Sequence, residues 1–178
     1  IMGHMAESSD LIASYTLAGN IDRLMTSGIY GIAAAAAVIV GKEIGAGNLK
    51  GVYNIGRALC FTSLIFGMGL GVLEYTMFVT LMRPFVMPLF SLSAVASQLC
   101  GVMLMCYACA IPLHSFSSTM AVGVLRGGGD VNAALLIDNA PLWLGTLPTM
   151  AILGLVLKVP NEIFCLCLMI EYILKSPL

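Results

Sequence analysis

A long uncharged stretch is the feature that most constrains the fold of this chain. From Pro84 to Leu125 the sequence contains no Asp, Glu, Lys or Arg. Because about 20 apolar residues are enough for a helix to cross the hydrocarbon core of a bilayer, this stretch is longer than one span needs. Hydrophobic residues make up 60% of the chain and charged residues 10%, whereas a soluble domain is about a quarter charged. We therefore expect an integral membrane protein that crosses the bilayer several times, in contact with membrane lipid.

The composition argues against several other classes of protein. A soluble fold of this size could not bury so much apolar surface, so we expect neither a soluble enzyme nor a disordered chain. The net charge of −1 offers no basic stripe for a phosphate backbone, so no nucleic-acid partner is expected. We predict no catalytic residues and no metal site, because no close set of His, Asp, Glu and Cys residues suggests either. The cysteines lie in apolar runs, so we interpret the CxxC of Cys106 and Cys109 as part of a helix, with a metal or redox site as the alternative.

Charges, glycines and prolines that interrupt the apolar runs predict where helices begin and end. Lys42 and the GAGN segment at 45–48 end the first run, and Asn48 is a predicted N-cap of the next helix. A turn at the membrane surface is predicted after Pro84, with Ser93 as the cap of the following helix. We predict an all-α, polytopic membrane helix bundle, because backbone polar groups in a bilayer must be paired within the chain. The predicted spans are approximately 11–43, 49–81, 94–125, 131–157 and 161–178.

Glycines inside and between these spans have separate interpretations. Gly67 and Gly71 form a GxxxG pair, which permits the close approach of another helix, although small residues are also ordinary in membrane helices. The glycine-rich segments GAGN (45–48) and RGGGD (126–130) lack the features of a phosphate-binding loop, so we interpret them as tight turns. Basic residues gather near these two segments, and the positive-inside rule therefore predicts that both face the cytoplasm.

Two motifs that contain these segments carry a resemblance to a known family. They are GIAAAAAVIVGKEIGAGN (31–48) and AVGVLRGGGD (121–130), and two spans separate them. In this order and spacing they resemble the C-terminal lobe of the multidrug and toxic compound extrusion (MATE) family, over about Ser8 to Pro177. The branch that looks closest contains the bacterial DNA-damage-inducible efflux proteins. The resemblance implies that the following are cytoplasmic hinge residues: Gly41, Gly45, Gly47, Arg126, Gly127, Gly129 and Asp130.

The resemblance implies an architecture and an activity. Members of the family have twelve helices in two six-helix lobes, so residues 1–178 would form a partial C-terminal lobe, from the end of helix seven to part of helix twelve. The N-terminal lobe of the same chain would be missing from this sequence. The implied protein is a multi-pass transporter of the cell (inner or plasma) membrane, not an enzyme. It would export drugs and other toxic organic compounds by antiport, with H⁺ or Na⁺ as the coupling ion and no cofactor.

Two other functions remain open from the sequence. A lipid-linked oligosaccharide flippase of the same superfamily would need a cavity lined with basic residues. A non-transporting membrane scaffold would need no ionisable groups at membrane depth, and Asp22 and Asp138 argue against it.

Ionisable and polar residues inside the apolar spans are the candidates for a functional cavity, because such groups are costly at membrane depth. Asp22 shares one helix face with Tyr15, and it either lines a cavity or lies at the interface. Asp138 either lines a cavity or bonds to another helix. His114, in the span that contains Pro112, is either a proton relay or a hydrogen-bonded helix contact. The candidate cavity residues are Tyr15, Asn20, Asp22, His114, Ser115, Asp138 and Asn139.

Two further positions carry specific expectations. Several members of the family have an acidic residue where this chain has Ser115, and the resemblance implies that such branches often couple transport through an Asp in the first helix. Glu74 interrupts its span near the outer end, and its side chain is predicted to reach toward the membrane interface rather than to serve a function.

Overall fold

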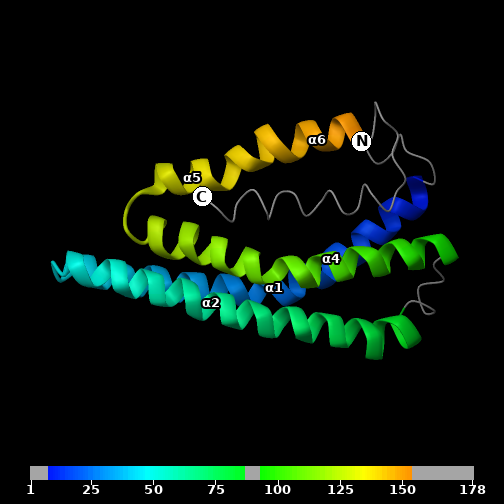
Figure 1. Cartoon of the computed structure of the whole chain (residues 1–178), viewed down its shortest axis with the longest axis horizontal. Helices are drawn as coiled ribbons and strands as arrows, with labels where there is room; N and C mark the ends of the chain where they lie inside the picture. The colour runs from blue at the N-terminus through cyan, green and yellow to red at the C-terminus, as the bar shows by residue number, and fades with distance from the viewer. Residues whose placement is uncertain (1–7, 87–92, 154–178) are drawn as a thin grey trace.

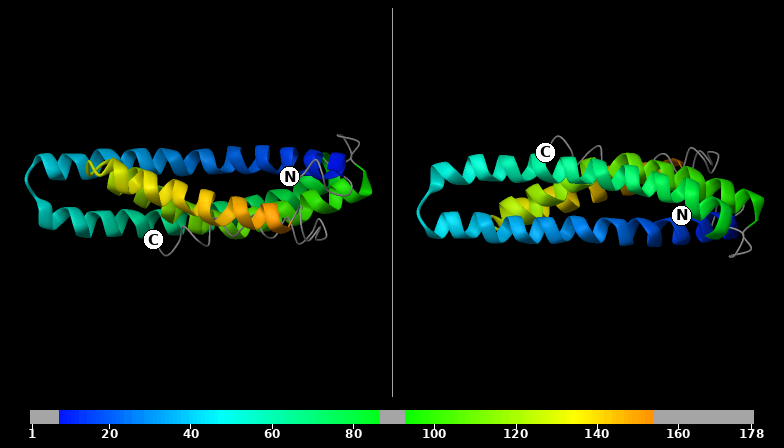
Figure 2. Two further views of the ribbon diagram at one scale, coloured as in Figure 1. Left: turned by 90° about the horizontal axis from the view of Figure 1, so that it is seen from above. Right: turned by 90° about the horizontal axis from the view of Figure 1, so that it is seen from below.

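Three long helices form the body of the structure. The computed structural model describes residues 8–86 and 93–153. α1 (Ser8–Gly45), α2 (Leu49–Met77) and α4 (Ala94–Ser118) lie side by side, and α4 packs against both α1 and α2 (Figure 1, Figure 2). No strand occurs in the described part of the chain. The predicted all-α helix bundle is confirmed.

Length and hydropathy fit these helices to a membrane. Within the described ranges, three helices are long and apolar enough to cross a bilayer, namely Ile12–Gly45, Gly51–Leu81 and Ala94–Arg126. Many of their outward-facing side chains are large and apolar, for example Leu24 and Val38, each 72% exposed. Such a surface would be a liability in water but is suited to lipid. By the length and hydropathy of these helices, the chain is a multi-pass membrane protein.

Segments of π-helix continue the long helices. η2 (Phe78–Val86) extends α2, and η3 (Thr119–Arg126) extends α4. The helix therefore continues through Pro84 to Val86, and most of the predicted surface turn lies outside the described residues. Pro112 lies inside α4 without ending it. A proline lacks the backbone N–H that an α-helical turn would use, and a local π-helical turn is one way in which a membrane helix accommodates it.

A fourth helical segment runs back along the bundle. It consists of α5 (Val131–Ala140), η4 (Pro141–Thr146) and α6 (Leu147–Ala151) in direct succession (Figure 1). The change of helix type falls at Pro141, the first residue of η4. The end of the predicted fourth span and the predicted fifth span, 161–178, lie outside the described residues.

Polar side chains cap the first turns of α2 and α4. The Asn48 side chain accepts a hydrogen bond from the Gly51 backbone N–H at 3.1 Å, and Ser93 accepts one from the Ala96 N–H at 3.0 Å. Both predicted caps are confirmed. Each satisfies a backbone donor that the first turn of a helix leaves unpaired.

A buried hydrophobic core lies between α1, α4 and α6. Leu99, Met103 and Leu104 of α4 are at most 3% exposed and pack with Ala18 and Ile21 of α1. Cys100 and Tyr107 of α4 and Met150 of α6 complete this cluster. The core therefore fixes α1 against α4 in the half of the bundle that is farther from the glycine-rich turns.

α2 approaches α4 closely through its GxxxG pair. A Cβ atom on Gly67 would lie 2.7 Å from the Cβ of Ser115, and one on Gly71 would meet the carbonyl oxygen of Ala108. Gly69, between them, has open space around its Cα. The close approach that Gly67 and Gly71 permit is therefore present in the structure.

η3 contacts the alanine run of α1 in a similar way. A Cβ on Gly123 would lie 2.7 Å from the Cβ of Ala36, and one on Gly127 would lie 2.7 Å from the Cα of Ala37. Ala33 and Ala36 are fully buried. Small residues on both helices thus let the two backbones touch.

Candidate functional site

A polar cavity lies beside α1 in the half of the bundle that contains the core. Its volume is about 390 Å³. Tyr15, Asn20 and Asp22 of α1 line it together with Tyr107 of α4, so the structure brings three of the predicted cavity residues to one place. Thr16, Gly19 and Arg23 complete its lining.

Helix geometry explains why these residues meet. Tyr15, Gly19 and Asp22 follow one another at spacings of four and three, which places them on one face of α1. The Asp22 carbonyl oxygen accepts a hydrogen bond from the Thr26 hydroxyl at 2.8 Å, one turn farther along.

Glu74 is a buried carboxyl group that the sequence interpretation misplaced. Its side chain is 1% exposed, and neither carboxyl oxygen has a hydrogen-bond partner among the described residues. The prediction that it reaches the membrane interface is therefore wrong. Gly67, Gly71 and Glu74 are spaced four and three residues apart, so Glu74 shares the face of α2 that packs against α4. That spacing is the sequence signal that could have located it.

The two acidic side chains of this region interact. The carboxyl groups of Asp22 and Glu74 are close enough for an electrostatic interaction between them, and Asp22 also interacts with Arg23. Asp22 lines the polar cavity, and Glu74 lies in the interior beyond it. The arrangement places two acidic groups at the junction of α1, α2 and α4.

Ser115 has a structural partner. It is fully buried, and its hydroxyl donates a hydrogen bond to the carbonyl oxygen of Ser63 in α2 at 2.6 Å. The side chain at the position where several family members have an acid therefore joins two helices and does not line the polar cavity.

His114 lies against α1. Its ring packs edge-on against the ring of Tyr30, with the ring centres 6.0 Å apart and an interplanar angle of 78°. This contact fits the predicted role between helices, while the proton-relay role stays a prediction. His114 does not line the polar cavity.

Asp138 and Asn139 lie near the RGGGD segment at 126–130, the second of the two predicted hinges. An oxygen of the Asp138 carboxylate lies 2.9 Å from a guanidinium nitrogen of Arg126, and the two side chains are 32% and 39% exposed. The side chain of Asn139 donates a hydrogen bond to the Leu135 carbonyl at 2.9 Å. The structure thus separates both residues from the polar cavity around Asp22.

The first predicted hinge, GAGN at 45–48, lies beside the second at one end of the bundle. A Cβ on Gly41 would lie 3.6 Å from the Gly127 carbonyl oxygen. Gly47 and Gly129 have positive φ angles of 76° and 92°, which other residues rarely adopt. Asp130 caps α5 by accepting a hydrogen bond from the Ala133 N–H at 3.1 Å. Gly45, the last residue of α1, has open space around it.

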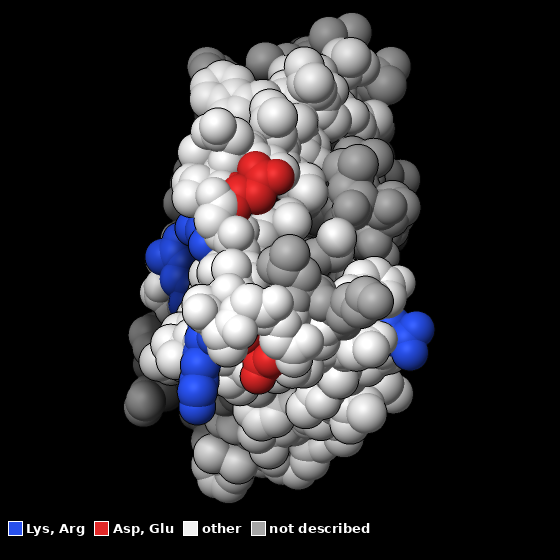
Figure 3. Space-filling model, turned by 90° about the vertical axis from the view of Figure 1, so that its left-hand side faces the viewer, with Lys and Arg blue, Asp and Glu red and all other residues white. Residues whose placement is uncertain are grey.

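Charged side chains gather at this end. Figure 3 views it along the bundle and shows basic and acidic side chains set in an otherwise uncharged surface. Lys42, Arg57 and Arg126 are exposed there. Such an end is suited to the water and headgroups beside a membrane.

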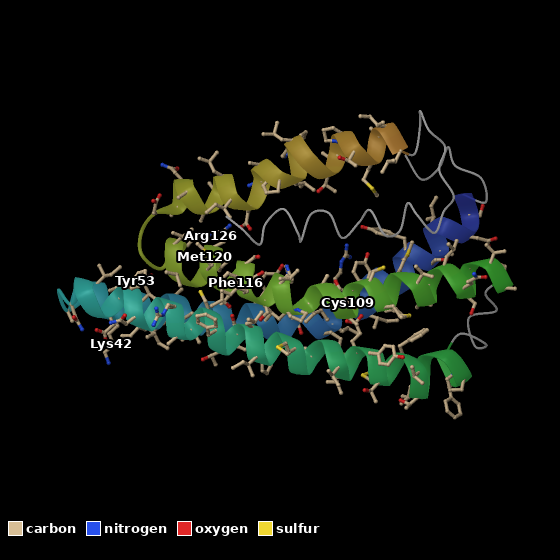
Figure 4. The ribbon with its side chains drawn as sticks, in the orientation of Figure 1. Lys42, Tyr53, Cys109, Phe116, Met120 and Arg126 are labelled. Carbon is tan, nitrogen blue, oxygen red and sulfur yellow. The ribbon has the colours of Figure 1, made fainter. Side chains whose placement is uncertain are left out.

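Two apolar grooves lie between α2 and the α4–η3 helix. The one nearer the hinges has a volume of about 550 Å³ and is lined by Tyr53, Phe61, Phe116 and Met120 among others. The second, of about 460 Å³, includes Cys109 in its lining. Figure 4 shows Tyr53, Phe116 and Met120 toward the hinge end and Cys109 farther along. These grooves present aromatic and sulfur-containing surface, which adapts to apolar molecules of varied shape.

The described residues contain no cluster of potential metal ligands. Among the residues described, no three His, Cys, Asp or Glu side chains are placed to hold a metal ion.

Comparisons with known proteins identify the family. The MatE family model matches residues 1–161, which is most of the chain. No curated protein and no solved structure matched this sequence. The chain belongs to the MatE family, whose members are multidrug and toxic compound extrusion transporters.

Proposed function

We propose that this chain is part of a secondary active transporter that exports drugs and other toxic organic compounds in exchange for H⁺ or Na⁺. The observation that carries the proposal is the polar cavity of about 390 Å³ around Asp22 in a bundle that is otherwise apolar. A carboxyl group beside such a cavity at membrane depth can bind a cation and release it as access changes. Membership of the MatE family supports the same activity.

The exchange requires a second structural unit. The proposed arrangement pairs this C-terminal lobe with an N-terminal lobe of six helices, with the substrate between them. Ion binding would favour one of the two access states, and substrate binding would favour the other. The aromatic and methionine surface near Phe116 and Met120 would suit apolar organic molecules, which bind mainly through shape and apolar contact.

The proposed setting is the inner or plasma membrane, with both hinges toward the cytoplasm. The basic side chains at the hinge end support this orientation through the positive-inside rule. The order and spacing of the two hinge motifs support the branch that contains the bacterial DNA-damage-inducible efflux proteins.

An efflux measurement tests the proposal. The chain, joined to its N-terminal lobe, is expressed in bacteria that lack their own drug exporters, and loss of preloaded ethidium is followed by fluorescence. We expect faster loss than in cells with an empty vector, and collapse of the H⁺ or the Na⁺ gradient should remove the difference. Equal retention of dye in the two strains, with the protein present in the membrane, would contradict drug export.

A pair of variants links the activity to the cavity. Asp22→Asn removes the carboxylate from the cavity and should abolish ion-driven dye loss. Asp10→Asn removes the same charge from the first turn of the same helix and should retain the activity. Equal activity of Asp22→Asn and the unmodified protein would argue against the cavity as the coupling region.

A further inference from the structure

We infer that Asp22 and Glu74 form a two-carboxyl site that holds one positive charge, a proton or Na⁺, inside the bundle. The inference rests on the proposed function and names the residues that couple transport to the ion. Glu74 is the inner member of the site, and Asp22 is the member that reaches the polar cavity.

The register of the helices places the two residues at one level. A Cβ on Gly28 of α1 would lie 3.8 Å from the Phe66 ring of α2. Because α1 and α2 are antiparallel, eight residues onward from Phe66 to Glu74 correspond to eight residues back from Gly28, which is Asn20. Asp22 is within one turn of that position. The electrostatic interaction between the two carboxyl groups agrees with this register.

α4 packs against the two-carboxyl site, in addition to α1 and α2. The contact of Gly71 with Ala108 sets α2 against α4, and the same antiparallel count brings Glu74 to the level of Leu104 and Met105. Leu104 is 1% exposed and belongs to the core. Apolar packing on this side keeps water away from Glu74.

The burial of Glu74 requires a positive charge. Both of its oxygens are buried without a hydrogen-bond partner in the described ranges, and an ionised carboxylate in such surroundings would be very unfavourable. A second carboxylate nearby adds repulsion when both groups are charged. A proton on Glu74, or one Na⁺ bound by the two carboxylates, removes the repulsion and the buried negative charge on Glu74.

Other charged and titratable groups near the site do not supply that charge. Arg23 interacts electrostatically with Asp22, but its side chain is exposed, and no ion pair within 4.0 Å joins the two residues in the described structure. α4 contributes the Tyr107 hydroxyl and the Cys100 and Cys106 thiols, which are neutral groups. His114 lies farther along α4 against Tyr30.

The cavity gives the site a route to solution. Asp22 and Arg23 both line the cavity, whereas Glu74 does not. An ion would therefore meet Asp22 first and reach Glu74 from there. A cation that occupies the site would also draw α1 toward α2, which connects ion binding to helix position.

Modification by dicyclohexylcarbodiimide tests the inference on the purified chain in lipid nanodiscs. This apolar reagent adds to a protonated carboxyl group and leaves a stable acylurea, which mass spectrometry locates. We expect modification of Glu74 near neutral pH and its absence in Glu74→Gln. Protection by NaCl but not by choline chloride would assign Na⁺ to the site. Modification that is unaffected by Na⁺ and declines as the pH rises would assign a proton to the site.

Variants of Asp22 test whether the two residues act together. Asp22→Asn should lower modification of Glu74 several-fold, and Asp22→Glu, which keeps the charge, should restore it. Asp10→Asn is the matched control and should have no effect, because Asp10 lies about 18 Å from Asp22 along α1. Size-exclusion chromatography checks that each variant remains folded.

The outcomes also separate this inference from the proposed function. Unmodified Glu74 at every pH, or equal modification in the Asp22→Asn protein, would overturn the two-carboxyl site. If dye export is still observed after such a result, the proposed transport function stands, and a different site couples it to the ion. If Glu74 is modified as expected but no dye is exported, the two-carboxyl site is supported and drug transport is contradicted.

Discussion

Ser63 and Ser115 exchange hydrogen bonds between α2 and α4. The Ser115 hydroxyl donates to the Ser63 carbonyl at 2.6 Å, and the Ser63 hydroxyl lies 3.3 Å from the Ser115 carbonyl while also reaching Cys60 in its own helix at 2.9 Å. Both serines are fully buried. In this chain, then, the position where several family members have an acid joins two helices, and a buried acid among the described residues, Glu74, lies on the neighbouring helix.

Removal of this hydrogen bond should weaken the α2–α4 contact. We expect Ser115→Ala to lower the free energy of unfolding by about 0.5–1.5 kcal/mol, as for other interhelical hydrogen bonds in membranes. SDS titration in mixed micelles, followed by circular dichroism, measures the change. Thr62→Ala, which removes an exposed hydroxyl bonded only within its own helix, is the control. Identical curves for Ser115→Ala and the unmodified protein would show that the bond adds no stability.

The glycine pair of α2 should tolerate no added methyl group. In Gly71→Ala the new Cβ would meet the Ala108 carbonyl, so we expect a loss of about 1–3 kcal/mol from the displacement of α4. Gly69→Ala adds the same methyl group to open space and should be neutral or slightly stabilising. Thermal unfolding of the two proteins in detergent compares them directly. A larger loss for Gly69→Ala than for Gly71→Ala would contradict the observed helix contact.

Replacement of the buried acid should stabilise the protein. Glu74→Met fills a similar volume and removes two buried oxygens without partners, so we expect a gain of about 1–3 kcal/mol. The gain should appear as a higher midpoint of thermal unfolding in detergent. Glu43→Met is the comparison, because that carboxylate accepts a hydrogen bond from Asn48 at 2.9 Å and its loss brings no such gain. A lower midpoint for Glu74→Met would mean that Glu74 supports the fold.

The ion pair across the second hinge should contribute little to stability. Arg126 and Asp138 are both about one-third exposed, and exposed pairs contribute about 0.2–1 kcal/mol. A double-mutant cycle with Arg126→Gln and Asp138→Asn measures the coupling energy, which added salt should reduce. A coupling well above this range that is insensitive to salt would indicate a pair shielded from water by lipid or by another part of the protein.

Local features of the fold were predictable from the sequence. The caps at Asn48 and Ser93 depend on a side chain and a backbone N–H three residues away, so a short stretch of sequence contains all the information they need. The all-α architecture follows from the apolar runs and the need to pair backbone groups in a bilayer. The π-helical segments depend on how prolines such as Pro84 and Pro141 are accommodated by packing, which hydropathy does not reveal.

The site was only partly predictable. Tyr15 and Asp22 share a face by simple helical spacing, and the structure places both at one cavity. Glu74 was misplaced because α2 is apolar on all sides, so composition alone does not reveal which face turns inward. The pairing of Asp138 with Arg126 depends on the geometry of the turn at Gly129, whose positive φ directs α5 back along η3.

The contact of Gly123 and Gly127 with the alanines of α1 has a mechanical consequence. Leucine and methionine side chains can change rotamer and let two helices slide, but main-chain atoms in direct contact have no such freedom. We therefore expect α1 and η3 to move as one rigid unit at that end. At the opposite end α1 and α4 are held together by side chains such as Met103 and Leu104 and not by glycine contacts, so a relative movement of the two helices would require these side chains to repack.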